Sequence, residues 1–166
     1  MDSYLERLQQ ELEATIGPLS SEIMKQAPAG KWSAAQIAEH LFLTYKGTAA
    51  GLAKCLEKGP LAKPSTLKDR IATTLVVRLG YMPGGRKSPE RAMPRGASPD
   101  DVRRDLFVEL QKVSAALDDC ERRYGPRTKL MDHPFIGPLT ADEWRKFHFV
   151  HGRHHLRQIR ERNKEA

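Results

Sequence analysis

The feature that most constrains this chain is a histidine-rich segment, residues 143–159, with the sequence E-W-R-K-F-H-F-V-H-G-R-H-H-L-R-Q-I. The pattern predicts one helix, and at about 100° per residue its aromatic and histidine side chains share one face. Residues on this face are Trp144, Phe147, His148, His151, His154, His155 and Gln158. A fold that buries the aromatic rings must therefore also bury imidazoles, which need polar partners or a common ligand. The opposite side carries Arg145, Arg153 and Arg160.

Two of these histidines have the spacing of metal ligands. His151 and His155 are one helical turn apart, so both imidazoles can reach the same ion. Candidates for a third ligand are His40, His133, His148 and His154. Among them, His40 is the one on a different long helix, whereas His133 precedes a proline in a loop and could belong to a lid. Spacing alone leaves open the alternative of hydrogen-bonded core histidines without a metal. For His154 we expect a half-exposed helix position with no role in the site.

The first half of the chain predicts three helices. Residues 3–26 form a helix that breaks or kinks at Gly17-Pro18, because proline removes a backbone donor and clashes with the previous turn. Residues 33–58 form a second helix, which ends at Gly59-Pro60. A shorter helix is expected within residues 66–79, where Ile71, Leu75 and Leu79 have helical spacing.

The second half predicts two long helices and two loops. Residues 80–99 are rich in proline and glycine, and their length indicates a crossover between the ends of the molecule. Ser98 or Asp100 caps a helix that continues to about residue 124, with Leu106, Leu110, Val113 and Leu117 pointing inward. Residues 130–138 form a second loop, which holds His133. No alternating strand pattern and no internal repeat is present.

Capping boxes support two of these helix starts. Ser33 is followed by Gln36, and Thr140 is followed by Glu143, so each side chain can satisfy a free backbone N–H of the other. Together the segments predict a single all-α domain over residues 1–166. We expect a four-helix bundle with a long crossover connection and a short extra helix.

Composition narrows the functional classes. The net charge of +7 could favour nucleic acid or an anionic small substrate, but the basic residues are dispersed and no nucleic-acid-binding motif is present. A solvated basic surface is therefore the expected explanation. No apolar run is long enough to span a membrane, and the N-terminal residues lack a signal-peptide pattern. We expect a cytoplasmic protein in which Cys55 and Cys120 are reduced thiols.

Two segments resemble the DinB-like superfamily of small metal-binding proteins. These are K-W-S-A-A-Q-I-A-E-H-L (31–41) and H-G-R-H-H-L-R-Q-I (151–159), which match that superfamily's W-S-x-x-x-I-x-x-H-L and H-x-x-x-H-x-x-Q-I helices. The segment 133–144, H-P-F-I-G-P-L-T-A-D-E-W, is similar to the lead-in of one branch. The resemblance implies a four-helix bundle that binds zinc, nickel or a similar ion through His40, His151 and His155.

The same resemblance implies an activity. Some DinB-like proteins transfer low-molecular-weight thiols such as bacillithiol, mycothiol or glutathione to electrophiles, and others resemble metal-dependent hydrolases. We therefore expect a metal-dependent transferase or hydrolase acting on a small molecule. Candidate pocket residues are His148, Gln158, Thr44 and His133. Gly47 and Gly51 lie on the same side of their helix as His40, where they could leave space for a ligand or allow close helix packing.

Alternative functions stay open. The chain could be a metal-binding or interaction module without turnover, an ordinary bundle with buried histidines, or a basic protein associated with nucleic acid. Phe149 and Leu156 are seven residues apart and are expected on the outer side of the last helix. An apolar pair at that position predicts a homodimer.

Overall fold

The computed structural model describes residues 3–82 and 88–165, and within them the fold is mostly helical. The helices are α1 (Ser3–Ile16), α2 (Ser21–Lys25), α3 (Ala34–Lys58), α4 (Leu67–Thr73), α5 (Pro99–Tyr124) and α6 (Ala141–Glu165). A π-helical segment, η1 (Thr74–Arg78), continues α4, and a 3-10 turn, η2 (Glu90–Ala92), precedes α5. The all-α class predicted from the sequence is confirmed.

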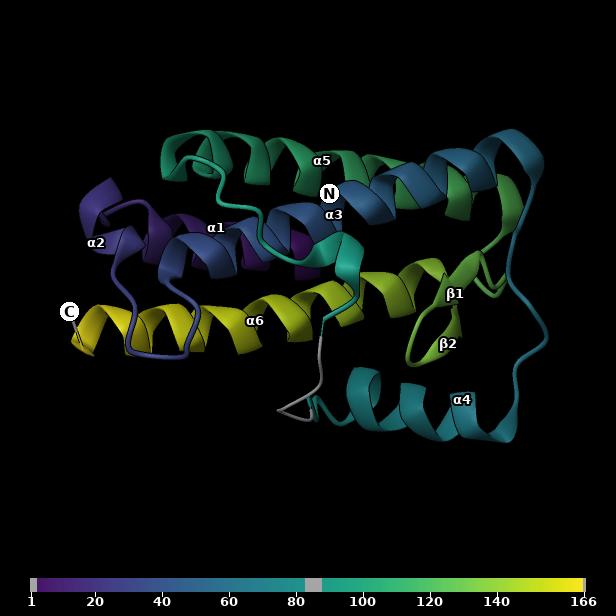
Figure 1. The fold of residues 1–166 in the computed structure, drawn as a ribbon. Helices are drawn as coiled ribbons and strands as arrows, with labels where there is room; N and C mark the ends of the chain where they lie inside the picture. The colour runs from purple at the N-terminus through teal and green to yellow at the C-terminus, as the bar shows by residue number, and fades with distance from the viewer. Residues whose placement is uncertain (1–2, 83–87, 166) are drawn as a thin grey trace.

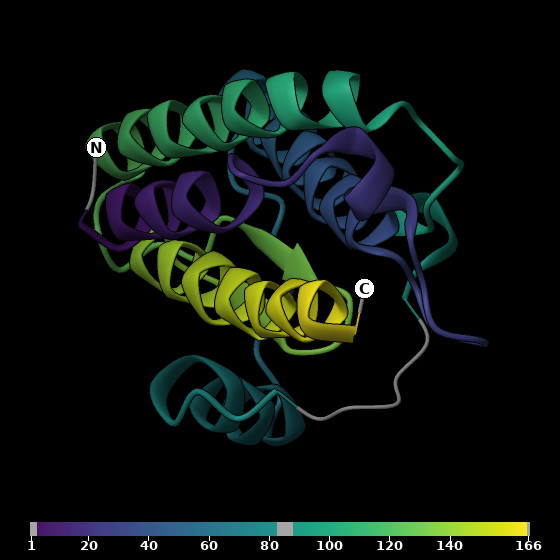
Figure 2. The ribbon, with the colours of Figure 1, turned by 90° about the vertical axis from the view of Figure 1, so that its left-hand side faces the viewer.

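The four long helices α1, α3, α5 and α6 lie alongside one another (Figures 1 and 2). Helices α1 and α6 run in the same direction, since Tyr4 packs on Phe149 and Thr15 accepts a hydrogen bond from Arg160. Helices α3 and α5 are also parallel, since Cys120 and Tyr124 of α5 bond to the carbonyls of Leu52 and Cys55 of α3. This pair is antiparallel to the first pair, because His40 of α3 lies against His155 of α6 and Tyr45 lies against His148. The chain must therefore return to the starting end between α3 and α5, as the predicted crossover requires.

The crossover carries α4 to the outer side of α6, away from α3 and α5 (Figures 1 and 2). Its return half passes through η2 along α3 before α5 begins at Pro99. The predicted loop 80–99 agrees with this path, although residues 83–87 of it lie outside the described part of the chain.

Helix boundaries follow the local sequence signals. The first helix stops at Ile16, immediately before Gly17-Pro18. Both predicted capping boxes are present, with Ser33 and Gln36 joined reciprocally at 2.9 and 3.2 Å. The Thr140–Glu143 pair does the same at 2.8 and 3.3 Å. Ser98 occupies the N-cap position of α5 without a side-chain cap bond.

A short hairpin replaces the loop expected at residues 130–138. Strand β1 (Met131–His133) pairs antiparallel with β2 (Gly137–Leu139), and Met131 lies opposite Leu139. Three-residue strands are too short to show an alternating pattern, which is why the sequence did not indicate them. Gly137, with φ of +76°, provides a backbone conformation that other residues rarely adopt.

Helix α6 is buried on more sides than its sequence pattern predicted. Arg145, Phe149 and Leu156, expected on the outer side, are only 4%, 8% and 0% exposed. Helices α1, α3 and α5 all contact α6, so its second face packs against protein instead of solvent. The dimer prediction therefore loses the apolar pair on which it rested.

Helix α4 shows the opposite discrepancy. The apolar stripe predicted within residues 66–79 runs from α4 through η1, but its members Ile71, Leu75 and Leu79 are exposed. The π-helical segment changes the angular spacing of the side chains, and Val76 and Val77 face the protein instead. Cys55 and Cys120 are buried free thiols, as expected. None of the described helices is both long and apolar enough to cross a membrane.

Candidate metal centre

Three histidine side chains converge between α3 and α6. The Nε2 atom of His151 lies 3.3 Å from Nε2 of His40 and 3.1 Å from Nε2 of His155. Zinc–nitrogen bonds of about 2.0–2.1 Å in a tetrahedron place neighbouring nitrogens about 3.3–3.4 Å apart. All three candidate ligand atoms lie within 4.8 Å of one another. The three residues can therefore hold one metal ion, and α3 and α6 bring together the three histidines that the resemblance implied as ligands.

Hydrogen bonds orient two of the three imidazoles. Nδ1 of His40 donates to the carbonyl oxygen of Ala92 at 2.8 Å, and Nδ1 of His155 donates to Oε1 of Gln158 at 2.8 Å. With the proton on Nδ1, the Nε2 lone pair of each ring faces the shared centre. Such partners of metal-ligating histidines fix the ring and its tautomer, and affect metal affinity. Gln158, predicted as a pocket residue, therefore orients one of the converging imidazoles.

His151 is held differently. Its ring stacks on Phe147, with centroids 5.3 Å apart and an interplanar angle of 16°. Its Nδ1 atom is buried and has no hydrogen-bond partner among the described residues. Packing between α6 aromatic residues thus positions the central ligand, while polar partners position the outer two.

The environment keeps these imidazoles neutral. Burial lowers the pKa of His40, and it lowers the pKa of His155 to about 3. Burial, followed by the neighbouring charges of His155 and His40, lowers the pKa of His151 well below its usual value. Metal binding requires unprotonated imidazole, so the site is in its binding form at neutral pH.

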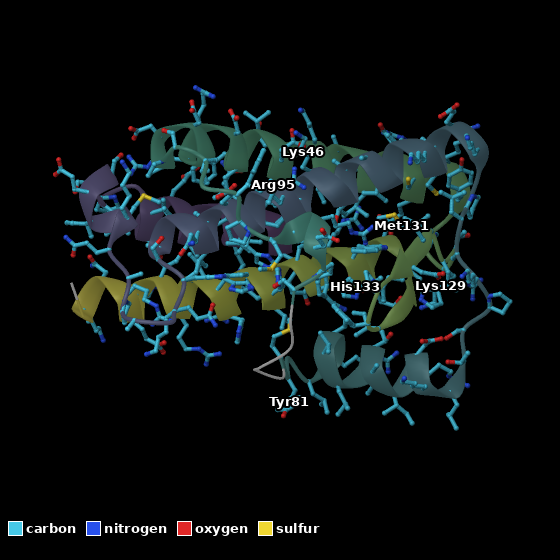
Figure 3. All side chains as sticks on the ribbon, viewed as in Figure 1. Lys46, Tyr81, Arg95, Lys129, Met131 and His133 are labelled. Carbon is cyan, nitrogen blue, oxygen red and sulfur yellow. The ribbon has the colours of Figure 1, made fainter. Side chains whose placement is uncertain are left out.

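The histidines open onto a cavity of about 1100 Å³. Trp32 and Thr44 line it beside His40, and Phe147 lines it beside His151. Figure 3 labels four more of its lining residues, namely Lys46 from α3, Arg95 from the crossover, and Met131 and His133 from the hairpin. The crossover thus forms one wall of the site.

Three of the four predicted pocket residues line the cavity, and the fourth is buried elsewhere. Thr44, His133 and Gln158 line the cavity, but His148 does not belong to its lining. His148 is fully buried and contacts the ring of Tyr45 instead. His154 is half-buried as expected. However, it also lines the cavity, and its Nε2 lies 3.3 Å from the Gln158 amide nitrogen.

Gly47 and Gly51 of α3 were expected either to leave space for a ligand or to allow close packing, and each fits a different one of these roles. A Cβ atom at Gly47 would meet nothing within 4 Å, and this residue lines the cavity. A Cβ atom at Gly51 would lie 2.6 Å from Sδ of Met131. Gly47 therefore leaves space in the cavity that His40 also lines, and Gly51 makes room for the Met131 side chain of the hairpin.

Sequence reasoning missed the groups contributed by the crossover. The carbonyl of Ala92 has no sequence signal, because every residue carries the same acceptor. Arg91 and Arg95 also line the cavity, and no sequence pattern distinguishes them from the other dispersed basic residues. The resemblance does not include residues 80–99, so it could not reveal site residues on the crossover.

Comparison with known proteins identifies the family. Residues 5–162 match the family model DUF1569, described as a protein of unknown function. Searches of curated proteins and of solved structures each found no match. Because the family model covers nearly the whole described chain, including all three converging histidines, this protein belongs to the DUF1569 family.

Proposed function

We propose that this protein is a metal-dependent enzyme that uses His40, His151 and His155 to hold zinc or nickel and acts on a small molecule. The observation that carries the proposal is the convergence of three neutral imidazole nitrogens at the edge of a large cavity. Three protein ligands leave a coordination position for substrate, as in catalytic zinc sites. A structural site would more commonly be closed by a fourth side chain.

We infer further that the helices form a four-helix bundle of the DinB-like type. Support comes from the two parallel pairs, α1 with α6 and α3 with α5, and from the crossover between α3 and α5. The histidines occupy the positions expected for that superfamily, one on α3 and two on α6.

Two reactions suit this site: transfer of a low-molecular-weight thiol to an electrophile, and hydrolysis of a small substrate. A zinc or nickel ion would supply positive charge that lowers the pKa of a bound thiol or water. Lys46, Arg91 and Arg95 line the cavity, and among the described residues none of their side chains pairs with a carboxylate. Three such cations favour a substrate that carries an anionic group.

His133 could orient that substrate. Burial, followed by the charge of Arg91, lowers the pKa of His133 to about 4, so its ring is neutral at pH 7. Its Nδ1 accepts a hydrogen bond from the backbone N–H of Phe135 at 3.2 Å. The ring proton therefore resides on Nε2, which can donate a hydrogen bond to a bound ligand.

Metal analysis of purified protein tests the first step. Wild type should hold one zinc or nickel ion per chain, whereas His40→Ala, His151→Ala and His155→Ala should each lose most of it. His133→Ala is the matched control, because it removes a cavity histidine outside the converging group and should retain metal. Wild-type protein that stays metal-free after reconstitution at neutral pH would contradict the proposal.

Activity is tested on the metal-loaded protein with a panel of thiols and a chromogenic electrophile, alongside chromogenic esters and amides. Thiol-dependent turnover that disappears in His40→Ala supports transfer, and ester or amide cleavage supports hydrolysis. Metal binding without turnover in either panel would favour the non-catalytic metal-binding module. Binding to DNA or RNA that persists at high salt would favour the nucleic-acid alternative, because mere charge attraction weakens steeply with salt. We keep the cytoplasmic location and the homodimer as predictions, the latter to be tested by light scattering.

A further inference from the structure

The residue next to the metal ligand on α3 is a buried carboxylate with unusual partners. Glu39 is 3% exposed and accepts hydrogen bonds from three successive backbone N–H groups of the crossover. The donors are Arg95, Gly96 and Ala97, at 2.8, 3.0 and 3.2 Å. No lysine or arginine side chain bonds to this carboxylate among the described residues. Backbone dipoles therefore balance its charge.

This arrangement depends on a particular backbone conformation. Gly96 has φ of +87°, which lets consecutive N–H groups turn toward one anion. The segment therefore forms an anion-binding concavity, and its anion is a side chain of the same protein. A non-glycine residue at position 96 would strain that turn.

The same short segment supplies the acceptor for His40. Ala92 lies three residues before Arg95, and its carbonyl accepts the Nδ1 hydrogen of His40 at 2.8 Å. Within residues 88–97, the described hydrogen bonds to other elements all go to Glu39 or His40. The adjacent α3 side chains Glu39 and His40 thus form the hydrogen bonds that hold this part of the crossover against α3.

We propose that Glu39 is a positioning residue of the metal centre. Its carboxylate fixes the crossover so that the Ala92 carbonyl holds His40 in the tautomer that directs Nε2 toward His151 and His155. This inference rests on the metal site proposed above and extends it from the three ligands to the segment that orients one of them. Without Glu39, three N–H groups lose their acceptor, and Ala92 is no longer held against the imidazole.

The direct test measures zinc affinity of Glu39→Ala and Glu39→Gln by competition with a chelator at one pH. Glu39→Ala should weaken affinity about tenfold to a hundredfold, the range observed when a partner of a ligating histidine is lost. Glu39→Gln should lie between Glu39→Ala and wild type, since its carbonyl oxygen can still accept. Glu57→Gln, an exposed position on the same helix, removes the same charge and should leave affinity unchanged.

A second pair of variants perturbs the crossover from its own side. Gly96→Ala and Gly125→Ala both place a Cβ where φ is close to +90° and where nothing lies within 4 Å. They should therefore lose similar stability, but only Gly96→Ala should weaken zinc binding. Equal zinc affinity in these two variants would count against the proposal. If Glu39→Ala fails to fold, the two glycine variants still test whether the crossover conformation affects zinc affinity.

Nitrogen-15 NMR of the imidazole rings provides a readout that needs no metal. In metal-free wild type, His40 should show the Nδ1–H tautomer with a slowly exchanging proton. In Glu39→Ala the ring should show mixed tautomers and fast exchange. Unchanged tautomer and unchanged zinc affinity in Glu39→Ala would overturn the positioning role. If the wild type binds no metal but the tautomer still depends on Glu39, the metal centre fails while the link from Glu39 to His40 stands.

Discussion

His148 is fully buried, and neither of its ring nitrogens has a hydrogen-bond partner among the described residues. An unsatisfied buried polar group costs about 1–3 kcal/mol. His148→Leu, which replaces the ring with an apolar side chain of similar size, should therefore raise the free energy of unfolding by about 1 kcal/mol or more. Urea denaturation of the metal-free proteins at pH 7.5 measures the difference. A loss of stability in His148→Leu would show that the imidazole is satisfied in solution.

Gly47 allows a test of the cavity that spares the fold. A leucine there would extend from α3 into the cavity that Gly47 and His40 both line, and replacing an interior helical glycine gains up to about 1 kcal/mol of stability. Gly47→Leu should therefore keep its melting temperature and its metal but lose turnover of the substrate found in the activity panel. Gly51→Leu is the contrasting variant: a Cβ there would lie 2.6 Å from Sδ of Met131, so the Met131 side chain must move aside and this variant should gain less stability than Gly47→Leu. Full activity in Gly47→Leu would place the substrate elsewhere.

The sequence predicted which histidines converge at the site better than it predicted the groups that hydrogen-bond to them. The i, i+4 spacing identified His151 and His155 as a pair, since helical geometry alone brings them together. His40 needed a resemblance, because 111 residues separate it from His151 and only the fold sets their distance. The partner of His40 is a backbone carbonyl, which no residue type encodes.

Helices α5 and α6 are joined by a buried arginine. Arg145 donates to Asp118 and Glu121, each at 2.8 Å, while its own side chain is only 5% exposed. Arg145→Met should lower the free energy of unfolding by about 1–3 kcal/mol, because two charge-assisted hydrogen bonds are lost across the helix interface. Chemical denaturation of variant and wild type measures this loss.

The matched control for Arg145 is on α5. Arg104 also bridges two acids, Asp101 and Asp105, but its side chain is 67% exposed. Arg104→Met should leave stability nearly unchanged, because solvent screens exposed ion pairs. Equal losses in the two arginine variants would show that burial does not strengthen the Arg145 contacts.

The difference between α4 and α6 shows what periodicity can predict at the element scale. Apolar spacing correctly predicted that both segments are helical, because side chains three and four residues apart share a face. It did not predict how many neighbours each helix has. Contacts from three long helices bury the second face of α6, whereas Ile71 of α4, Leu75 of η1 and the following Leu79 stay exposed. The number of packed neighbours is set by the path of the whole chain.

For the whole molecule, burying several neutral histidines makes stability depend on pH. Burial lowers the pKa of both His148 and His155 to about 3, compared with about 6.5 in an unfolded chain. Well above pH 6.5 neither state binds these protons, so the contribution is constant. Between pH 6.5 and 3 the unfolded state binds more protons, and stability falls as the pH falls.

The expected slope of this decline approaches about 1.4 kcal/mol per pH unit for each buried neutral histidine. Urea unfolding of metal-free protein between pH 7.5 and 5 should therefore show a flat region followed by a steep loss, in a range where carboxylates contribute little. His148→Leu removes one such group, so its slope near pH 5 should be shallower by about 1.4 kcal/mol per pH unit. Parallel curves for wild type and His148→Leu would mean that this ring takes up a proton in the folded state. The folded core would then tolerate a charge that burial is expected to exclude.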